Sequence, residues 1–461
     1  MEASVLNNRR ETARYPSRYQ LRLPLDRSVG QLRPDERIDV AGVLCRLLGQ
    51  DLTFEGDKTA RALHNLHAFA AKFPPQLPHL FIHELTCPGE WVLDPMVGSG
   101  TTVVEAVLAG RHAIGIDLDP LAVLTAHVKS TPLDLPRCAQ AGAQVLEQAK
   151  KSLLSGSDEK PKSTYLPQAI EFFQYWFEDH TIAELYALVQ AIGRVEENDT
   201  RNFLEVVFSS TIITKTGGLS RARDLAHSRP HRDADKQIKR SALDVFRERL
   251  YTAVGSLEDV VDATGRHLLV RADARSLPLR DNSVHLIVTS PPYAANAIDY
   301  MRAHKFSLMW FGYDPKVLSN LRNKYIGAEL RSSKSEFASE AANQVLRVLR
   351  QTDGRRAAVV AHYFHDMEIA LREMLRVLVE GRAAVLVVGS STIRGVEIRA
   401  PTVLGELAAS VGFHVVGMAE RRIVRNARMM PMSHNSSRNG IEARMHEEGV
   451  IGLVKPRNGE S

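Results

Sequence analysis

Cysteine is scarce in this chain of 461 residues, which has three of them, at Cys45, Cys87 and Cys138. They are too few and too scattered for a disulfide framework or a zinc cage, so a reducing compartment, the cytoplasm, is expected. The sequence also lacks a run of about 18 apolar residues, and no membrane-spanning helix is expected. Its N-terminus carries arginines without the apolar stretch of a secretory signal, so we expect no such signal.

Composition otherwise sets few limits on the class of protein. Apolar residues make up 44% and charged residues 25% of the chain, which is ordinary for a water-soluble globular protein. The 59 basic and 54 acidic residues leave a net charge of +5, which is compatible with a polyanionic partner but does not require one. A chain of this length is sufficient for about two or three structural units.

The first 60 residues are polar and rich in arginine, and three prolines interrupt any long element there. We expect residues 1–60 to form an N-terminal arm that contains one short helix near Val40–Leu48. For residues 1–35, a disordered tail is an equal alternative, because few apolar residues are available there to bury.

The central part of the sequence alternates between short apolar runs and helical segments, the pattern of a parallel sheet covered on both faces. Helices are expected at Thr102–Ala109 and near Met367–Leu378. Seven strands are expected, at Trp91–Leu93, Ala113–Ile116, His267–Val270, Val284–Val288, Ala383–Val388, His414–Val416 and Val450–Leu453. The last two of these are expected to form an antiparallel pair. The predicted fold class is therefore α/β, with a doubly wound, mostly parallel seven-stranded sheet of the Rossmann-like kind.

Two long stretches interrupt this alternation. Residues 131–264 begin with a helical stretch rich in Ala, Gln and Leu, pass through a polar linker and continue helically. Because the flanking strands must still pair, we expect an inserted helical subdomain there. It separates the first part of the core, residues 61–130, from the second part, residues 265–461. A second insertion is expected at residues 294–355.

A glycine-containing loop, D-P-M-V-G-S-G-T-T at Asp94–Thr102, joins the first expected strand to the first expected helix. Asp94 ends the strand at the carboxyl edge of a parallel sheet, where ligands bind. Gly98 and Gly100 allow a sharp turn and a close approach of the backbone to a ligand. The loop therefore predicts a ligand site at this edge of the sheet.

The helix after this loop carries its own boundary signals. Thr102 and Glu105 have the spacing of a capping box, in which the threonine hydroxyl and the glutamate satisfy free backbone N–H groups. Gly110 suits the position just beyond the last turn, where a left-handed conformation ends a helix. We therefore expect the helix to begin beside the ligand.

The second expected strand ends in another acid, Asp117, which can accept hydrogen bonds from both hydroxyl groups of a ribose. The loop is not a dinucleotide-binding fingerprint, because Val103 replaces the third glycine. A carboxylate at Asp94 suits a ligand with a cationic amino group and no phosphates, and S-adenosylmethionine is such a ligand. The residues expected to contact this cofactor are Asp117 and, in the loop, Asp94, Pro95, Met96, Gly98, Ser99, Gly100, Thr101 and Thr102.

A second motif, T-S-P-P-Y at Thr289–Tyr293, follows the fourth expected strand. Two consecutive prolines remove two backbone donors and leave carbonyl acceptors facing the ligand crevice. Such a surface needs a partner rich in donors, and an exocyclic amino group qualifies. Asp273, after the third strand, is placed to accept a hydrogen bond from the adenine amino group of the cofactor. An ordinary loop aspartate is the alternative for this residue.

Together, D-P-x-x-G-S-G-T-T and T-S-P-P-Y resemble the amino-methyltransferase group of DNA methyltransferases. The S-P-P-Y form resembles the cytosine-N4 enzymes, whereas the adenine-N6 enzymes more often carry Asp or Asn in place of Ser290. The resemblance covers the sheet elements and implies the methyltransferase form of the Rossmann-like fold. The chain departs from the family at Met96, where Phe is usual, and in its long helical insertion.

Two further stretches extend the resemblance. H-N-L-H followed by A-K-F-P-P, at His64–Pro75, resembles the segment that closes on the methionine end of the cofactor in such enzymes. This similarity implies cofactor contacts by Lys72 and Phe73. N-A-I-D-Y followed by H-K, at Asn296–Lys305, resembles the continuation beyond S-P-P-Y in one bacterial subset.

The resemblance implies transfer of a methyl group to the N4 amino group of cytosine by direct displacement. This amine is a poor nucleophile because its lone pair is delocalised into the ring. The Ser290 hydroxyl and the Pro291 carbonyl would accept both N–H groups and aim the lone pair at the methyl group, while Pro292 removes a second backbone donor. Tyr293 would stack on the target base, flipped out of the duplex. The alternative for Tyr293 is an ordinary packed aromatic residue.

The implied partner is DNA, and the densest basic stretch, residues 214–240, is the expected contact surface. Its candidate contact residues are Lys215, Arg221, Arg223, Arg229 and Arg232. A solvated surface loop balanced by nearby aspartates is the alternative. A second basic cluster consists of Arg421, Arg422, Arg425 and Arg428. Phosphate contact and salt bridges are equally open for this cluster.

Other functions stay open beside this one. Adenine-N6 methylation of DNA and guanine-N2 methylation of RNA both use acceptors around an exocyclic amine. A catalytically silent DNA-binding paralogue is the non-enzymatic alternative, and the intact motif residues argue against it. Methylation at cytosine C5 is not expected, because it needs a cysteine nucleophile after a proline, whereas Cys87 precedes Pro88. A cognate restriction or defence nuclease is a candidate partner.

Overall fold

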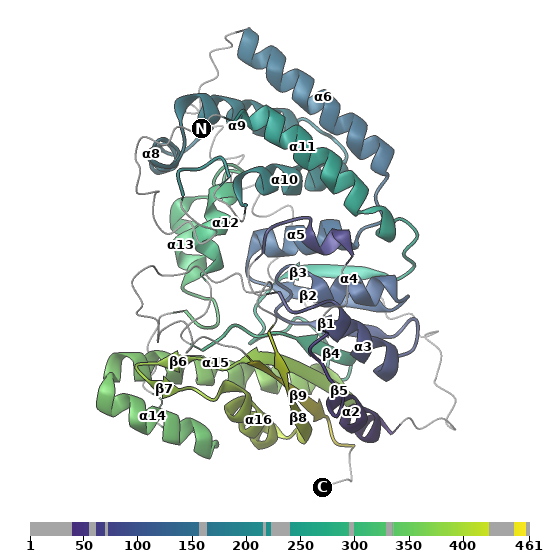
Figure 1. The fold of residues 1–461 in the computed structure, drawn as a ribbon, viewed down its shortest axis with the longest axis vertical. Coiled ribbons are helices and arrows are strands. Elements are labelled where there is room, and N and C mark those ends of the chain that lie inside the picture. The colour runs from purple at the N-terminus through teal and green to yellow at the C-terminus, as the bar shows by residue number, and fades with distance from the viewer. Residues whose placement is uncertain are drawn as a thin grey trace.

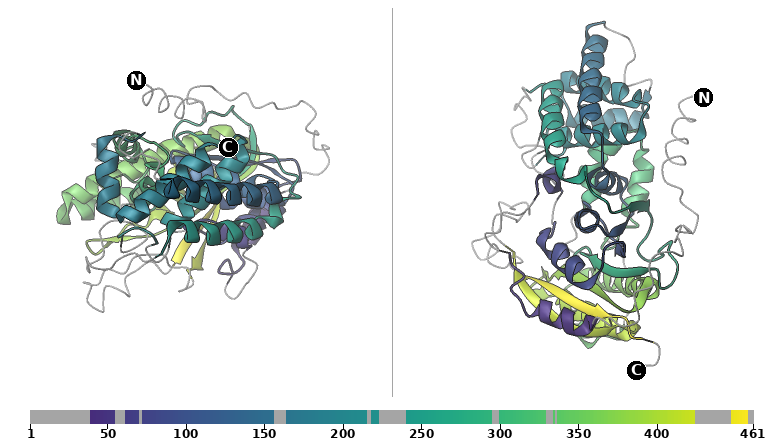
Figure 2. Two further views of the ribbon diagram at one scale, coloured as in Figure 1. Left: turned by 90° about the horizontal axis from the view of Figure 1, so that it is seen from above. Right: turned by 90° about the vertical axis from the view of Figure 1, so that its right-hand side faces the viewer.

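The structure is a computed structural model in which a mixed sheet lies below a group of helices (Figure 1). It describes residues 39–54, 61–69, 72–155, 164–214, 218–222, 240–294, 299–328, 334, 336–423 and 447–457. Figure 2 shows the molecule as elongated, with the helical subdomain at one end and the last strand pair at the other. None of the described helices is both long enough and apolar enough to cross a membrane.

The sheet has seven strands in the order β3-β2-β1-β4-β5-β9-β8. Their bounds are β1 (Trp91–Asp94), β2 (His112–Asp117), β3 (His267–Arg271), β4 (Val284–Thr289), β5 (Leu378–Gly389), β8 (His414–Arg422) and β9 (Glu447–Val454). The first five pair in parallel, whereas β9 runs antiparallel to both β5 and β8. The α/β fold class, all seven strands and the terminal antiparallel pair are therefore confirmed. A short hairpin of β6 (Thr392–Ile393) and β7 (Val396–Glu397) follows β5.

Neighbouring residues on each strand face opposite sides of the sheet, so two separate cores form. Val92 and Leu286 are buried on one face, and Leu93 and Ile287 on the other. The first face is covered by α2 (Val40–Leu48), α3 (Gln76–Leu85) and α4 (Thr101–Leu108). The second is covered by α14 (Glu340–Thr352), α15 (Gly354–Val377) and α16 (Ala400–Val411). Nearly continuous apolar strands are the expected consequence of burial on both faces.

The short helix α2 has the bounds expected for it, and it is an integral part of the core. Leu44 and Leu48 pack over β9 at Gly452, where a Cβ atom would lie 2.9 and 2.7 Å from these two side chains. The Asp39 carboxylate caps the helix by accepting a hydrogen bond from the Gly42 N–H. Residues 39–54 of the expected arm therefore belong to the folded core, while residues 1–38 and 55–60 lie outside the described residues.

Several helices lie in the sequence between the two parts of the core. They are α6 (Leu135–Leu154), α8 (Pro167–Trp176), α9 (Asp179–Gly193), α10 (Asn198–Ile212) and α11 (Ala242–Ser256), which are together called the helical subdomain. Helix α5 (Pro120–Ser130) packs against both α4 and α10, and it thereby joins the sheet to the subdomain. There are also two short 3-10 helices. The first, η1 (Ala62–Asn65), precedes α3 in the chain, and the second, η2 (Glu258–Val260), follows α11 and precedes β3.

The second expected insertion does not form one unit. Its first helices, α12 (Tyr300–Leu308) and α13 (Pro315–Arg322), share a core with the helical subdomain. The indole of Trp310 stacks on Phe173 of α8 with ring centroids 3.8 Å apart. Helix α14 instead packs with α15 and α16 on the sheet. The expected segment 294–355 is thus divided, because its apolar residues find partners in two different cores.

Candidate active site

The loop between β1 and α4 has the sharp turn expected of it. Gly98 and Gly100 both take left-handed conformations, with φ of 48° and 83°. A Cβ atom at Gly100 would lie 2.8 Å from the Ala126 backbone, and one at Gly98 would lie 3.3 Å from the Phe69 ring. Glycine is therefore required at Gly100 for space as well as for conformation. The Val97 N–H donates to the Ile116 carbonyl of β2, which fixes the loop against the neighbouring strand.

The capping box predicted for α4 was wrong. The helix begins after Gly100, whose left-handed backbone provides no side-chain cap. Thr102 is the second residue of the helix, two positions past the N-cap, and its hydroxyl donates to the Val288 carbonyl of β4 instead. The Glu105 carboxylate binds the His64 and His79 rings at 2.7 and 3.0 Å. The expected position of Gly110, left-handed just beyond the last turn, is confirmed.

Asp94 joins the two sequence motifs. Its carboxylate accepts a hydrogen bond of 2.7 Å from the Thr289 hydroxyl and one of 3.1 Å from the Met96 N–H. Its side chain is buried, and this burial raises the pKa of Asp94 to about 6, against the lowering effect of both hydrogen bonds. The carboxyl ends of β1 and β4 therefore meet as the parallel topology requires.

Asp117 ends β2 beside the same loop. Its carboxylate accepts hydrogen bonds from the Gly98 and Asp119 N–H groups at 3.0 and 2.9 Å. Burial, together with the negative charge of Asp119, raises the pKa of Asp117 to about 7. Two carboxylates with raised pKa values thus lie at neighbouring strand ends. A cationic ligand rich in N–H and O–H donors would favour their ionised forms, so these residues fit S-adenosylmethionine.

Asp273 follows β3 and lies next to Asp117 in the fold, since the Ala272 N–H donates to the Asp117 carbonyl. Its carboxylate is held by Arg275 through hydrogen bonds of 3.0 and 2.7 Å, and Arg275 also pairs with Asp366. An adenine amino group would have to share this carboxylate with the guanidinium. Contact between Asp273 and the cofactor stays a prediction.

The segment at His64–Pro75 lies against the cofactor loop, but its expected residues differ in their placement. Lys72 reaches the His64 carbonyl with its ammonium group. Phe73 is buried in the core between α3 and the sheet. The ring that contacts the loop belongs to Phe69, which also stacks on Tyr300 with centroids 4.7 Å apart. The roles of Lys72 and Phe73 in cofactor binding stay predictions.

A buried lysine of α5 contacts the loop between β1 and α4. Lys129 on α5 is 1% exposed and donates a hydrogen bond of 2.7 Å to the Ser99 carbonyl. Burial, with the nearby charge of Lys72, lowers the pKa of Lys129 well below its usual value. Local sequence pattern did not predict this contact, although Lys129 is the one lysine of α5.

Asp119 ties the segment after the second motif to the end of β2. Its carboxylate caps α5 and also binds the His304 ring at 2.7 Å and the Tyr325 hydroxyl at 2.9 Å. His304 belongs to the stretch at Asn296–Lys305, of which residues 296–298 lie outside the described residues. The stretch that follows the second motif therefore contacts the end of β2, on the cofactor side of the site.

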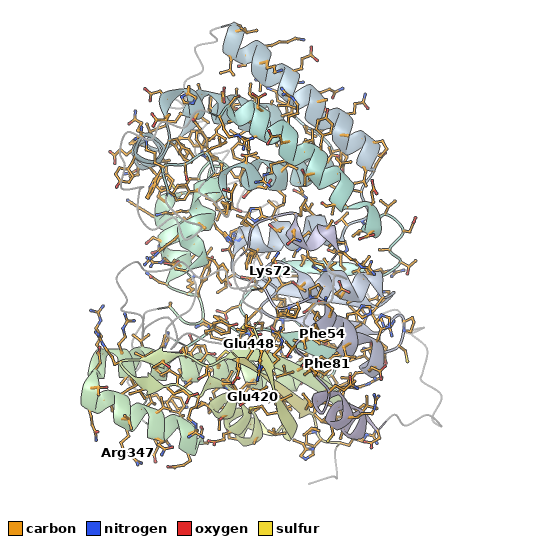
Figure 3. The ribbon with its side chains drawn as sticks, in the orientation of Figure 1. Phe54, Lys72, Phe81, Arg347, Glu420 and Glu448 are labelled. Carbon is orange, nitrogen blue, oxygen red and sulfur yellow. The ribbon has the colours of Figure 1, made fainter. Side chains whose placement is uncertain are left out.

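The second motif leaves β4 at the same carboxyl edge. Ser290 is partly exposed. Pro291 is buried and Pro292 partly exposed. The Tyr293 hydroxyl donates a hydrogen bond of 2.6 Å to Glu448 on β9, which is labelled in Figure 3. Burial and the negative charge of Glu448 raise the pKa of Tyr293 well above its usual value.

Most of the expected DNA-contact residues cannot be placed. Lys215, Arg223, Arg229 and Arg232 lie outside the described residues. Arg221 pairs with Glu178 at 3.0 Å, and its backbone N–H donates to the Trp176 carbonyl. In the second basic cluster, Arg421 is buried and forms a salt bridge with Glu448, so of the two alternatives for this cluster the salt bridge holds for Arg421. Contact between residues 214–240 and DNA stays a prediction.

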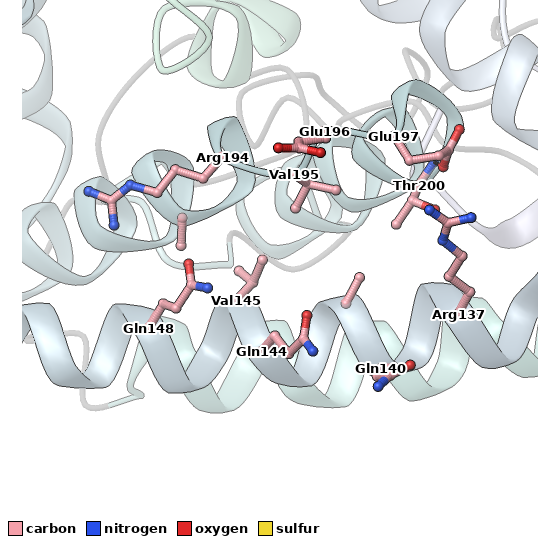
Figure 4. A pocket seen from close by; sticks show the side chains of 12 residues that line it. Arg137, Gln140, Gln144, Val145, Gln148, Arg194, Val195, Glu196, Glu197 and Thr200 are labelled. Carbon is pink, nitrogen blue, oxygen red and sulfur yellow. Dashed lines mark hydrogen bonds between the residues drawn. The ribbon is translucent and has the colours of Figure 1, made fainter.

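A polar groove of about 310 Å³ lies between α6 and the turn from α9 to α10 (Figure 4). Gln140, Gln144 and Gln148 project into it from α6. Two arginines and two glutamates also line it, so it offers no net charge that would attract phosphates. It lies within the helical subdomain rather than at the carboxyl edge of the sheet. Across the described ranges, no group of His, Cys, Asp and Glu side chains is arranged to hold a metal ion.

Comparison with known proteins points to one family. A family model described as DNA methylase, of the N6/N4 methyltransferase type, matches residues 51–127. The Type II methyltransferase M.MvaI of Kocuria varians is 24% identical over 422 residues, which cover 85% of this chain and 90% of that one. M.BsoBI of Geobacillus stearothermophilus, also a Type II methyltransferase, is 21% identical over 355 residues, covering 70% and 67%.

Among solved structures, TrmN from Thermus thermophilus is similar to 83% of this chain at 13% identity, with a TM-score of 0.28. The chain spans about half the length of that protein, 49%. The family model covers β1, the cofactor loop and β2, where Asp94 and Asp117 lie. The chain is therefore similar to DNA methyltransferases of the N6/N4 type, through a family model that matches residues 51–127 and through Type II methyltransferases that align with most of its length.

Proposed function

We propose that this chain methylates the N4 amino group of cytosine in DNA. The observation that carries the proposal is Ser290, which directly follows the Thr289 hydroxyl bound to Asp94. A serine at this place offers one hydroxyl acceptor and no negative charge. The adenine-N6 members of the family more often have Asp or Asn there. An uncharged, partly exposed hydroxyl beside the cofactor loop therefore favours cytosine.

The chain's own residues would hold both reactants in line. Bound S-adenosylmethionine supplies an electrophilic methyl group on a sulfonium. Asp94 would accept hydrogen bonds from the amino group of its methionine end, and Asp117 would accept them from the ribose hydroxyls. These contacts would hold the cofactor at the carboxyl ends of β1 and β4, the edge at which Ser290 follows β4. Orientation of this kind is a large part of catalysis when the nucleophile is weak.

On the base side, the Ser290 hydroxyl and the Pro291 carbonyl would accept the two N–H bonds of cytosine N4. This arrangement favours a pyramidal nitrogen whose lone pair points at the methyl group. The bound cofactor would supply the methyl group for direct displacement by this nitrogen, and the proton that the nitrogen loses would pass to water. Tyr293 would stack on the base, which must leave the duplex to reach the site.

The proposal is tested by producing the chain in a host that lacks DNA methylation. DNA and RNA are then digested separately and the modified nucleosides identified by mass spectrometry. We expect N4-methylcytosine in DNA, and we expect it to disappear in an Asp94→Ala variant. N6-methyladenine in DNA, or a modified nucleoside in RNA alone, would overturn the assignment to cytosine.

The names of the similar proteins support a proposal about partners. The relatives described above are named Type II methyltransferases, and we propose that this chain likewise acts in a restriction-modification system beside a cognate nuclease. We also propose that residues 214–240 contact DNA phosphates. Charge reversal at Arg221 and Arg223 should weaken DNA binding, reduce its salt dependence and leave cofactor affinity unchanged. An Arg247→Glu variant on α11 is the control, and equal DNA binding by all three proteins would contradict the proposal.

A further inference from the structure

The hydroxyl of Tyr293 is not available to a substrate. It donates to Glu448, and both side chains are almost fully buried, at 8% and 7% exposure. Tyr293 follows two prolines, which restrict the backbone on one side of the ring. The hydrogen bond to Glu448 fixes the far end of the same ring. The aromatic plane is therefore held at both ends.

Glu448 is itself held by a buried arginine. Arg421 on β8 lies opposite Glu448 on β9, and the two side chains form an ion pair. The Arg421 guanidinium also donates a hydrogen bond of 3.0 Å to the Leu52 carbonyl, in the segment after α2. Glu448 is in addition the register partner of Gly389, the last residue of β5. A chain of contacts thus runs from the sheet's antiparallel edge to the tyrosine of the second motif.

Buried ion pairs of this kind add little to stability on their own. Removing two charges from water costs several kcal/mol, and well-packed apolar residues of the same volume often serve a fold as well or better. A second pair, Glu90 with Arg382, is comparably buried but precedes β1 at the opposite end of the strand. It contacts neither motif, and it therefore provides a matched control.

We propose that Glu448 and Arg421 are positioning residues that set the angle at which the Tyr293 ring meets the flipped base. Tyr293 then offers the base the small part of its ring that the core leaves exposed, while its hydroxyl serves only to orient that ring. This inference rests on the proposed function for the presence of a base in the site, but it does not depend on which base is methylated.

The test compares Tyr293→Phe, Glu448→Gln, the double variant and Glu90→Gln. Incorporation of labelled methyl groups into chromosomal DNA from a methylation-free host gives kcat and KM for DNA and for cofactor. We expect Tyr293→Phe and Glu448→Gln each to lower kcat/KM for DNA by about 10- to 100-fold, since a misplaced reactant costs that much. The KM for the cofactor should stay within about twofold of the wild-type value.

The double variant separates positioning from general support of the fold. If Glu448 acts through the tyrosine hydroxyl, the double variant should match Tyr293→Phe, whereas independent effects would multiply. Glu90→Gln should lower the melting temperature about as much as Glu448→Gln and leave kcat/KM for DNA unchanged. Equal kinetics in Glu448→Gln and Glu90→Gln would overturn the inference, and so would multiplied effects in the double variant.

Two outcomes keep the inference separate from the proposed function. The modified nucleoside made by the wild-type chain decides between cytosine and adenine, whereas the ratios between variants decide the role of Glu448. Should Glu448→Gln fail to fold, Tyr293→Phe removes only one oxygen atom and decides the matter alone. Wild-type kcat/KM for DNA in that variant would refute the inference.

Discussion

The raised pKa values of Asp94 and Asp117 predict that cofactor binding weakens as the pH falls. Burial raises the first pKa to about 6, and burial with the charge of Asp119 raises the second to about 7. Both acids must be ionised to accept hydrogen bonds from the amino group and the ribose hydroxyls. Because these pKa values are raised, both acids are almost fully ionised near pH 8, and the affinity for the cofactor is highest there. The affinity then falls as the pH drops through 7 and then 6.

The size of the effect follows from the fraction of protein that is ionised. At pH 5 an acid with a pKa near 7 is about 99% protonated, so the dissociation constant rises about 100-fold relative to pH 8. If Asp94 must ionise as well, its pKa near 6 contributes a further factor of about 10 at pH 5. We therefore expect the dissociation constant to rise between about 100- and 1,000-fold from pH 8 to pH 5. The α-amino group of the cofactor, with an ordinary pKa of about 7.7–8.0, is almost fully charged below pH 7 and does not offset this loss.

Isothermal titration calorimetry from pH 5 to pH 8 measures this change. Repeating the titration near pH 6.5 in two buffers of different ionisation enthalpy counts the protons released, and we expect about one. An Asp117→Asn variant should lose the upper part of the pH dependence. The exposed Asp51, changed to asparagine, is the control and should leave the curve unchanged. A dissociation constant that stays level from pH 5 to pH 8 would refute this account of the two acids.

Three further substitutions test other parts of the structure. Gly100→Ala places a methyl group against the Ala126 backbone in a left-handed conformation, and it should abolish measurable cofactor binding in calorimetry while retaining secondary structure. Trp310→Ala removes the ring stacked on Phe173 and should lower the free energy of unfolding by about 3–5 kcal/mol in urea titrations. Lys129→Met frees a carbonyl of the cofactor loop, and it should weaken cofactor binding about tenfold, as one charged hydrogen bond would, without lowering the melting temperature. Unchanged values in any of these measurements would contradict the contact concerned.

The features predicted correctly from sequence depend on topology. Asp94, Asp117 and Thr289 each end a strand of a parallel sheet, and such ends must meet at one edge. Their proximity therefore followed from the order of apolar runs alone. The helix Val40–Leu48 was equally visible from its apolar spacing, although its docking on Gly452 was not.

The features that were missed depend on contacts between distant segments. The spacing of Thr102 and Glu105 is local, but Thr102 bonds to β4 and Glu105 to two histidines from other elements. The bond from Tyr293 to Glu448 spans 155 positions and needs the register of β9 against β5. Local pattern carries no information about such partners, because tertiary contacts outweigh helix-capping preferences of about 1 kcal/mol.

The second insertion shows the same limit at a larger scale. Residues 294–355 appear as one interruption in the sequence, yet Trp310 packs into the aromatic core of the helical subdomain while α14 covers the sheet. Which core an apolar side chain joins depends on the shape of the partner surface. Apolar spacing predicts that such a residue is buried and leaves its partner open.

Transfer of a methyl group to the exocyclic nitrogen of cytosine is the function that we propose for this site. The most direct measurement supplies the purified chain with S-adenosylmethionine that carries a trideuterated methyl group and with methylation-free chromosomal DNA, and then analyses the nucleosides by mass spectrometry. The account predicts the label on N4 of deoxycytidine and nowhere else. Label on N6 of deoxyadenosine, on carbon 5 of cytosine, or on no nucleoside at all would contradict it.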